Sequence, residues 1–160
     1  MSGLGHIGEL QVIDHLQNKE GCTIYLPMKD KGIDFIAVKD NLSTQIQVKT
    51  SKYQKNSYYW FDLSVHKMVY SPNTVYIFVL YTLPRRKILG RARNYLVIPS
   101  LKLKEWIEKG DLAEKKGSSD IINLFIYPIE SSLEWVYRNK GKEINLTEYW
   151  NNFSLADHVG

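Results

Sequence analysis

Two segments, 33–38 and 45–50, are separated only by residues 39–44, which begin with the turn-prone string Lys39-Asp40-Asn41-Leu42-Ser43. Residues 33–38 form a short run rich in apolar residues, and residues 45–50 alternate polar and apolar residues. Both patterns are typical of a β-strand. Asp, Asn and Ser in the intervening string favour a turn. We therefore predict a β-hairpin with a loop near residues 40–43, and this hairpin constrains the fold more than any other segment.

Helical periodicity appears on both sides of the hairpin. An amphipathic helix is predicted over residues 4–19, ending at Gly21, because apolar residues recur there at helical spacing: Leu4, Ile7, Leu10, Ile13 and Leu16. A second helix is expected over residues 101–107, capped by Ser100. Less regular helical segments are expected over residues 133–137 and 146–150.

Short apolar runs predict further strands over residues 23–26, 58–63, 75–81, 95–98 and 121–127. No repeat or linker interrupts this order of helices and strands. The sequence therefore predicts one α/β domain over residues 1–160.

The composition suits a compact protein. With 160 residues, 44% of them hydrophobic, the chain can bury one core. Cys22 is the only cysteine, which excludes an intrachain disulfide and a cysteine-based zinc site. The longest apolar runs are too short to cross a bilayer, and the N-terminus lacks the pattern of a signal peptide. We expect a cytoplasmic protein with no membrane partner.

The charge is distributed unevenly along the chain. Residues 1–104 contain 15 Lys and Arg against 7 Asp and Glu, whereas residues 105–160 contain 6 against 10. A basic body with an acidic C-terminal third is compatible with a polyanionic partner on one side of the molecule. A solvated basic face is the alternative interpretation.

The two strands of the predicted hairpin carry polar side chains on one face. Because side chains alternate along a strand, Asp34 shares one face of the first strand with Ile36 and Val38. Gln47 and Lys49 lie on the matching face of the second strand. A loop near residues 40–43 puts Asp34 across from Lys49 and one step from Gln47.

This cluster has two interpretations. Asp34 and Lys49 could form a surface ion pair, worth about 0–1 kcal/mol. Ile36 and Val38 on the same face indicate instead that something covers it, and a partly buried charged cluster needs partners or a metal ion. From the residues alone, a functional site and a structural ion pair both stay open.

The strings Gly32-Ile33-Asp34-Phe35-Ile36 and Gln45-Ile46-Gln47-Val48-Lys49-Thr50-Ser51 resemble the PD-(D/E)XK nuclease superfamily. The resemblance is to the branch whose second motif reads Gln-x-Lys, seen in some homing endonucleases and restriction-like enzymes. In that superfamily a preceding helix contributes a glutamate, and Gly5-His6-Ile7-Gly8-Glu9-Leu10 matches this element, with Glu9 in the glutamate's place.

The resemblance covers residues 4–52 as motifs and the order of elements to about residue 110. It implies an α/β, restriction-endonuclease-like fold, in which helices flank a mixed β-sheet core. Residues 111–160 would form a family-specific C-terminal extension.

The resemblance also implies roles for individual residues. The catalytic set would be Glu9, Asp34, Gln47 and Lys49, and Mg²⁺ or Mn²⁺ would bind to Asp34, Gln47 and the backbone carbonyl of Val48, because hard divalent ions take oxygen ligands. Lys49 would orient the attacking water or neutralise charge in the transition state. Gln47 stands where most relatives have a carboxylate, so we expect a weaker metal affinity and one ion per site.

Basic residues near the hairpin are candidates for phosphate contacts. Five of them lie within nine positions, where the alternative is an exposed hairpin loop: Arg85, Arg86, Lys87, Arg91 and Arg93. Lys52 and Lys55 extend the same nucleic-acid-binding prediction. The 11 tyrosines are too dispersed along the chain to predict a stacking platform.

The glycines Gly3, Gly5 and Gly8 formally match a dinucleotide-binding pattern. No strand precedes them, which the pattern requires, so we reject this interpretation. We expect instead that they let the start of the first helix approach the sheet or a DNA backbone.

These inferences predict a divalent-metal-dependent DNA endonuclease of homing, restriction or repair type, acting on double-stranded DNA. Cutting two strands usually needs two sites, so we expect a homodimer or a higher homo-oligomer. Two alternatives stay open. One is a catalytically impaired nuclease fold kept as a nucleic-acid-binding or assembly module, with Gln47 marking decay. The other is a protein-interaction factor that uses the acidic C-terminal third.

Overall fold

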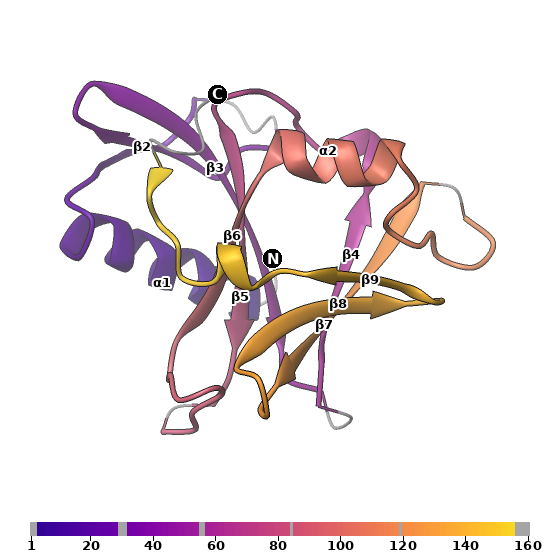
Figure 1. The fold of residues 1–160 in the computed structure, drawn as a ribbon. Helices are drawn as coiled ribbons and strands as arrows, with labels where there is room; N and C mark the ends of the chain where they lie inside the picture. Colours follow the sequence, from indigo (N-terminus) through magenta and orange to yellow (C-terminus); the bar gives the residue numbers. More distant parts are fainter. Residues whose placement is uncertain (1–2, 29–31, 55–56, 84, 119, 156–160) are drawn as a thin grey trace.

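The computed structural model describes residues 3–28, 32–54, 57–83, 85–118 and 120–155. Within these ranges the chain forms two α-helices and two β-sheets (Figure 1). The elements follow in the order α1 (Gly3–Asn18), β1 (Thr23–Tyr25), β2 (Phe35–Lys39), β3 (Leu42–Lys52), β4 (Tyr59–Ser64), η1 (Val65–Lys67), β5 (Thr74–Tyr81), β6 (Asn94–Pro99), α2 (Ser100–Glu108), β7 (Ile121–Ile129), β8 (Glu134–Asn139), β9 (Lys142–Asn145) and η2 (Thr147–Tyr149).

The first sheet is mixed, as predicted. Its strands lie in the order β1-β2-β3-β5-β6, and only the β3–β5 pair is parallel. The parallel register runs from Gln45 opposite Thr74 to Lys52 opposite Tyr81 without interruption. The α/β fold class with a mixed, helix-flanked sheet is therefore confirmed.

The hairpin of β2 and β3 closes through a tighter turn than predicted. Lys39 pairs with Leu42, so only Asp40 and Asn41 form the loop. Both have positive φ angles, 51° and 65°, as a type I′ turn requires, and Asp and Asn accept this conformation better than most residues. The loop predicted at residues 40–43 is therefore too long.

The tighter turn shifts the register of the hairpin by two residues. Phe35 lies opposite Ile46, so Asp34 comes level with Gln47 instead of Lys49. The prediction that Asp34 lies across from Lys49 is wrong. A shift of two residues nevertheless leaves each side chain on its predicted face, because side chains alternate with a period of two.

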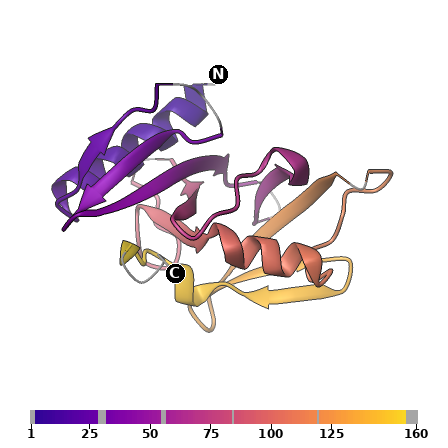
Figure 2. The ribbon, with the colours of Figure 1, turned by 90° about the horizontal axis from the view of Figure 1, so that it is seen from above.

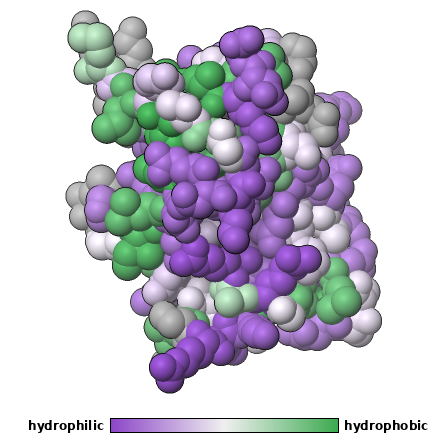
Figure 3. Space-filling view, turned by 90° about the vertical axis from the view of Figure 1, so that its left-hand side faces the viewer, coloured by the Kyte–Doolittle hydropathy of each residue, from purple (hydrophilic) through white to green (hydrophobic). Residues whose placement is uncertain are grey.

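Helix α1 packs on one face of the first sheet, but with a different stripe from the predicted one. Its fully buried residues are Gly8, Val12 and Leu16, spaced four apart, whereas Ile7 and Leu10 are 41% and 52% exposed. On the side of the molecule that holds α1, hydrophobic side chains form separate patches among hydrophilic ones (Figure 3).

Gly8 allows a close approach between α1 and β3. A Cβ atom at this position would overlap Thr50 Oγ1 and would lie 2.9 Å from Thr50 Cβ and 3.0 Å from Thr50 Cγ2. Rotation of the threonine cannot remove the overlap, because Cβ itself is too near. The expected approach of the glycine-rich helix to the sheet is thus confirmed at Gly8.

We expect Gly8→Ala to destabilise the protein by up to about 2 kcal/mol. Alanine favours a helix over glycine by about 1 kcal/mol, but the overlap with Thr50 costs about 1–3 kcal/mol and displaces α1. Denaturant unfolding measures this difference. Gly3→Ala is the control, because a Cβ at Gly3 meets nothing within 4 Å. Equal stability of the two variants would contradict the close approach.

The second sheet covers the other face of the first. Its four antiparallel strands lie in the order β4-β7-β8-β9, and Tyr59 and Trp135 from this sheet share one core with Tyr76 and Phe78 of β5. Seen from above, α1 lies on the far side of the first sheet from α2 and β7 (Figure 2). The site described below therefore lies on a sheet that is packed on both faces.

Two predicted helical segments differ from the structure. Residues 133–137 mostly belong to strand β8, whose Trp135 and Tyr137 are fully buried, so the helical prediction there is wrong. Large aromatic and β-branched residues favour a strand where a neighbouring strand can pair with them, as β7 does. Residues 146–150 contain only the single 3₁₀ turn η2.

Helix α2 begins where predicted, but Ser100 does not cap it. Ser100 is the first helical residue, and its hydroxyl accepts from the Ser71 N–H and donates to the Ser71 carbonyl. It therefore ties the helix to the loop before β5. Among the described residues, no helix has the length and apolar character needed to cross a bilayer.

Candidate active site

Asp34 is held in place by the neighbouring strand. Its backbone N–H donates to the Ile46 carbonyl at 2.9 Å, and its Oδ2 accepts from the Val48 N–H at 2.7 Å. Hydrogen bonds to a carboxylate are short and strong because the acceptor is charged. The side chain of Asp34 is therefore fixed beside the middle of β3.

The Val48 carbonyl is directed to the same side as the Val48 N–H. Both groups of one residue point to the same neighbour in a strand, and the N–H of Val48 points to Asp34. Strand β2 begins at Phe35, whose partner is Ile46, so the β2–β3 pairing ends before Val48. The carbonyl oxygen thus lies on the Asp34 side of β3.

Gln47 carries an unsatisfied oxygen. Its Oε1 is buried and has no hydrogen-bond partner among the described residues. A buried polar atom without a partner costs about 1–3 kcal/mol, so native proteins rarely contain one without a reason. Gln47 directly precedes Val48, the residue whose N–H binds the Asp34 carboxylate, so its side chain leaves β3 one residue from that contact.

Glu9 of α1 joins the cluster from the helix. Burial raises the pKa of its carboxyl above the usual value, the negative charge of Asp34 raises the pKa further, and His6 lowers it. Two carboxylates therefore influence each other across the helix and the hairpin. Among the residues described, no group of three or more His, Cys, Asp or Glu could hold a metal ion.

Lys49 follows Gln47 by two residues on β3, so the two side chains share a face about 7 Å apart along the strand. Lys49 is half-buried and forms no ion pair with a described residue. The alternative of a surface ion pair between Asp34 and Lys49 is therefore not realised. Among the described residues, no carboxylate competes with a ligand for this ammonium.

The raised pKa of Glu9 has a consequence for stability. The folded protein holds a proton on Glu9 more tightly than the unfolded chain does, so ionised Glu9 destabilises the fold at neutral pH. This penalty disappears as the pH falls through the raised pKa and below the ordinary value of 4.5. A cation between Glu9 and Asp34 would remove it as well.

We therefore expect Glu9→Gln to raise the Tm near neutral pH in EDTA and to leave it unchanged at about pH 4. Saturating Mg²⁺ should abolish the gain, because the wild-type pair is then neutralised. Thermal unfolding followed by circular dichroism measures both effects. Glu130→Gln, at an exposed turn, is the control. A gain for Glu9→Gln that is independent of pH would contradict the acidic pair.

The predicted basic residues divide between two places. Arg91 lies over the ring of Trp150, with 5.4 Å from its guanidinium carbon to the ring centroid, and Arg93 pairs with Asp14 at 3.4 Å. These two cations contact protein groups near η2 and α1.

The remaining cations lie near the carboxyl ends of β3 and β5. Arg85, Arg86 and Lys87 are exposed in the loop after β5, and Lys52 is exposed at the end of β3. Lys55 lies outside the described residues.

The sequence prediction missed an aromatic cluster. Tyr53, Tyr58 and Tyr81 line one groove together with Lys52 and Arg86. These tyrosines are far apart in the sequence and come together because Lys52 of β3 pairs with Tyr81 of β5. The dispersal of these tyrosines along the chain therefore does not keep them apart in the fold. Only the parallel pairing could have revealed this cluster.

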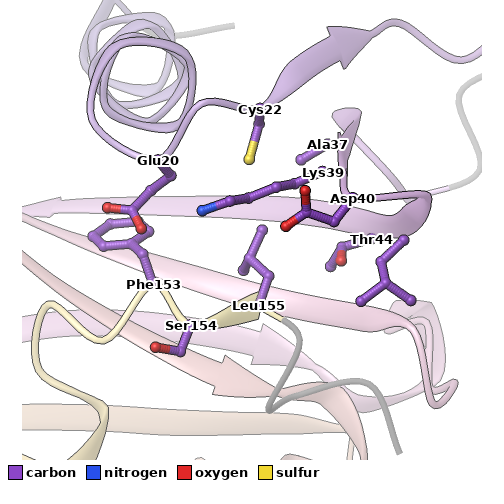
Figure 4. Close-up of a pocket in the computed structure, with 10 residues that line it drawn as sticks. Glu20, Cys22, Ala37, Lys39, Asp40, Thr44, Phe153, Ser154 and Leu155 are labelled. Atoms are coloured by element: carbon purple, nitrogen blue, oxygen red, sulfur yellow. The ribbon is translucent and has the colours of Figure 1, made fainter.

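Cys22 lines a separate cavity of about 290 Å³. Its side chain and those of Lys39 and Asp40 lie at this cavity, beside Phe153 (Figure 4). Burial raises the pKa of the Cys22 thiol, and Cys22 is only 7% exposed. A buried thiol of this kind behaves as a small apolar side chain.

Comparison with known proteins adds little at the level of residues. No protein-family model and no curated protein matches the chain. Among solved structures, the chain is similar to a bacterial homing endonuclease, I-Ssp6803I, with 18% sequence identity and a TM-score of 0.42. The alignment covers 61% of this chain and 67% of that one. No residue role transfers at these values, so the candidate site rests on the contacts described above.

Proposed function

We propose that this chain is a divalent-metal-dependent endonuclease that hydrolyses phosphodiester bonds in DNA. The single observation that carries the proposal is the buried Oε1 of Gln47, which has no partner among the described residues. Gln47 is the neighbour of Val48, whose N–H fixes the carboxylate of Asp34. The acidic neighbour Glu9 and the ammonium of Lys49, which forms no ion pair with a described residue, complete the set. The resemblance of these motifs to PD-(D/E)XK nucleases indicates phosphodiester hydrolysis as the reaction.

The residues fit Mg²⁺ or Mn²⁺. Hard divalent ions take oxygen ligands, and Mg²⁺ uses one or two carboxylates together with water. Asp34, the amide oxygen of Gln47 and the carbonyl of Val48 would hold the ion, and Glu9 would position its water shell. A cation there would satisfy the oxygen of Gln47 and reduce the repulsion between Glu9 and Asp34.

When bound, such an ion polarises a phosphoryl oxygen and lowers the pKa of a water molecule. The other steps belong to the chain's own residues. Lys49 orients the attacking water and neutralises the charge that develops on the phosphoryl oxygens. The Val48 N–H fixes Asp34, so the carboxylate needs little reorganisation during the reaction.

We expect Gln47→Leu to raise the stability of the metal-free protein by about 1 kcal/mol or more, because it removes an unsatisfied buried oxygen. The same variant should lose most of the Mn²⁺ affinity. Unfolding in EDTA and a calorimetric Mn²⁺ titration measure the two effects.

Gln45→Leu is the matched control on the same strand face. Gln45 Oε1 accepts from the Thr74 hydroxyl at 3.0 Å, so this variant should lose stability and keep its Mn²⁺ affinity. An unchanged Mn²⁺ affinity in Gln47→Leu would remove Gln47 from the proposed ligands.

Supercoiled plasmid incubated with the protein and Mg²⁺ or Mn²⁺ tests the proposed activity. We expect cleavage that EDTA abolishes. A homodimer, which we also propose, would produce linear plasmid directly because two sites cut opposite strands, whereas a single site would produce nicks. Absence of cleavage with either ion would overturn the nuclease proposal.

The lack of a third acidic ligand among the described residues favours one competitor, an impaired nuclease fold that only binds nucleic acid. It predicts DNA binding that falls with salt, survives Asp34→Asn and gains nothing from divalent ions. The plasmid assay and a binding titration with and without Mg²⁺ separate the two functions.

A further inference from the structure

A groove of about 560 Å³ opens where β3 and β5 end and β4 begins, at the lower end of the ribbon in Figure 1. Its walls include Lys52, Tyr53, Tyr58, Tyr81, Leu83 and Arg86. The groove is distinct from the cluster around Asp34. It is larger than the cavity beside Cys22 and differs from it in lacking an acidic side chain among its lining residues.

The tyrosine rings of the groove are braced by other aromatic rings. Tyr53 packs against Tyr59, with 5.1 Å between the ring centroids. Tyr58 packs edge-on against Phe125 at 5.6 Å and beside Tyr127 at 5.5 Å. Tyr53 and Tyr58 are both half-buried, so the sheet supports each ring while part of it faces the groove. Rings held in this way need little ordering to receive a flat ligand.

Cations lie beside these rings. The guanidinium carbon of Arg86 is 5.0 Å from the centroid of the Tyr53 ring. Lys52 is exposed at the end of β3, the strand next to β5. Neither cation forms an ion pair with a described residue. The groove therefore offers aromatic surface and unneutralised positive charge together, which suits a ligand that is both flat and anionic.

We propose that this groove binds an unstacked nucleobase and its phosphate within a single-stranded segment of DNA. Stacked bases in an intact duplex do not expose their faces to a groove of this kind, whereas an extrahelical or unpaired base does. Lys52 lies three residues beyond Lys49 on β3, which is about 10 Å along the strand. A strand that occupies the candidate active site would thus reach the groove within a few nucleotides.

The inference rests on the proposed function in taking DNA as the ligand, but binding is measured without cleavage. Fluorescence anisotropy in EDTA compares a labelled single-stranded oligonucleotide of about 12 nucleotides with a blunt duplex of the same length. We expect the single strand to bind at least about five-fold more tightly, because one stacked base contributes that much or more. Equal affinities would overturn the proposal.

Two variants assign the effect to the groove. Tyr53→Leu keeps an apolar side chain but removes the π face, and Arg86→Gln removes an exposed charge without disturbing the core. Each should weaken single-strand binding about five- to hundred-fold, by a larger factor than it weakens duplex binding. Tyr25→Leu is the control, because Tyr25 is 55% exposed on β1, away from the groove. Unchanged affinity in Arg86→Gln would overturn the proposal even if Tyr53→Leu fails to fold.

Both a nucleotide within a DNA single strand and a free nucleotide carry a base and a phosphate. Competition with a free nucleoside monophosphate distinguishes these two ligands. Displacement only at far higher concentration than unlabelled oligonucleotide supports a single-strand site, and displacement at equal concentration overturns it. Lys49→Ala distinguishes the two proposals, because it should lose plasmid cleavage and retain the single-strand preference. If the wild type shows the preference but does not cleave plasmid, the groove proposal is supported and the nuclease proposal is overturned. If it cleaves plasmid without the preference, the nuclease proposal is supported and the groove proposal is overturned.

Discussion

Asp34→Asn should lower the rate of Mg²⁺-dependent DNA cleavage by about 10³-fold or more, which corresponds to the loss of several kcal/mol of charge stabilisation. The asparagine oxygen can still accept from the Val48 N–H, which lies 2.7 Å from the present carboxylate, so the hairpin should stay folded. The substitution removes the negative charge and replaces the second carboxylate oxygen by an amide NH2 group. Initial cleavage rates on a plasmid, compared at matched protein stability, measure the effect.

Asp40→Asn is the matched control for this variant. Asp40 lies in the turn of the same hairpin with a φ of 51°, a conformation that asparagine also accepts, and it is exposed. We expect its cleavage rate and its Tm to equal those of the wild type. If Asp34→Asn cleaves as fast as Asp40→Asn, then Asp34 holds no metal.

Lys49→Met should lower the cleavage rate by about 10²–10⁴-fold, the range found for a positioned charge or proton-transfer group. Methionine keeps most of the apolar stem of the lysine, so the half-buried position should tolerate it. Lys49 forms no ion pair with a described residue, which means that its removal leaves no carboxylate without a partner there. The loss should therefore appear in cleavage and not in stability.

A comparison of metal binding distinguishes Lys49 from the proposed ligands. Lys49→Met should retain or increase the Mn²⁺ affinity, because it removes a positive charge near the ion. Asp34→Asn should weaken that affinity by about 100-fold or more. Lys39→Met, at the exposed end of β2, controls for a general effect of lysine loss. A cleavage rate in Lys49→Met equal to that of Lys39→Met would remove Lys49 from the catalytic set.

Local patterns in the sequence predicted the hairpin and the face of each side chain. Strict alternation placed Asp34, Gln47 and Lys49 on one face, and this result survives the change of register because the period is two. The register itself was predicted wrongly because it depends on whether Asp40 and Asn41 adopt a left-handed turn. The order of polar and apolar residues along the chain does not indicate which type of turn forms.

Features that depend on distant segments were not predictable in the same way. The buried stripe of α1 is set by the contact of Gly8 with Thr50, so Ile7 and Leu10 stay exposed although their spacing indicates a core face. Trp135 lies in a strand because β7 is available to pair with β8. The unsatisfied oxygen of Gln47 likewise becomes visible only when its neighbours are in place.

Crystals of the protein soaked with Mn²⁺ and measured at a wavelength that reveals manganese test the metal site most directly. We predict one anomalous peak per chain, within coordination distance of an Asp34 carboxylate oxygen, the Oε1 of Gln47 and the carbonyl oxygen of Val48. The same soak of Gln47→Leu crystals should show a weaker peak or none. A wild-type site without a peak, in which the Oε1 of Gln47 is hydrogen-bonded to a protein donor, would contradict the proposed metal site.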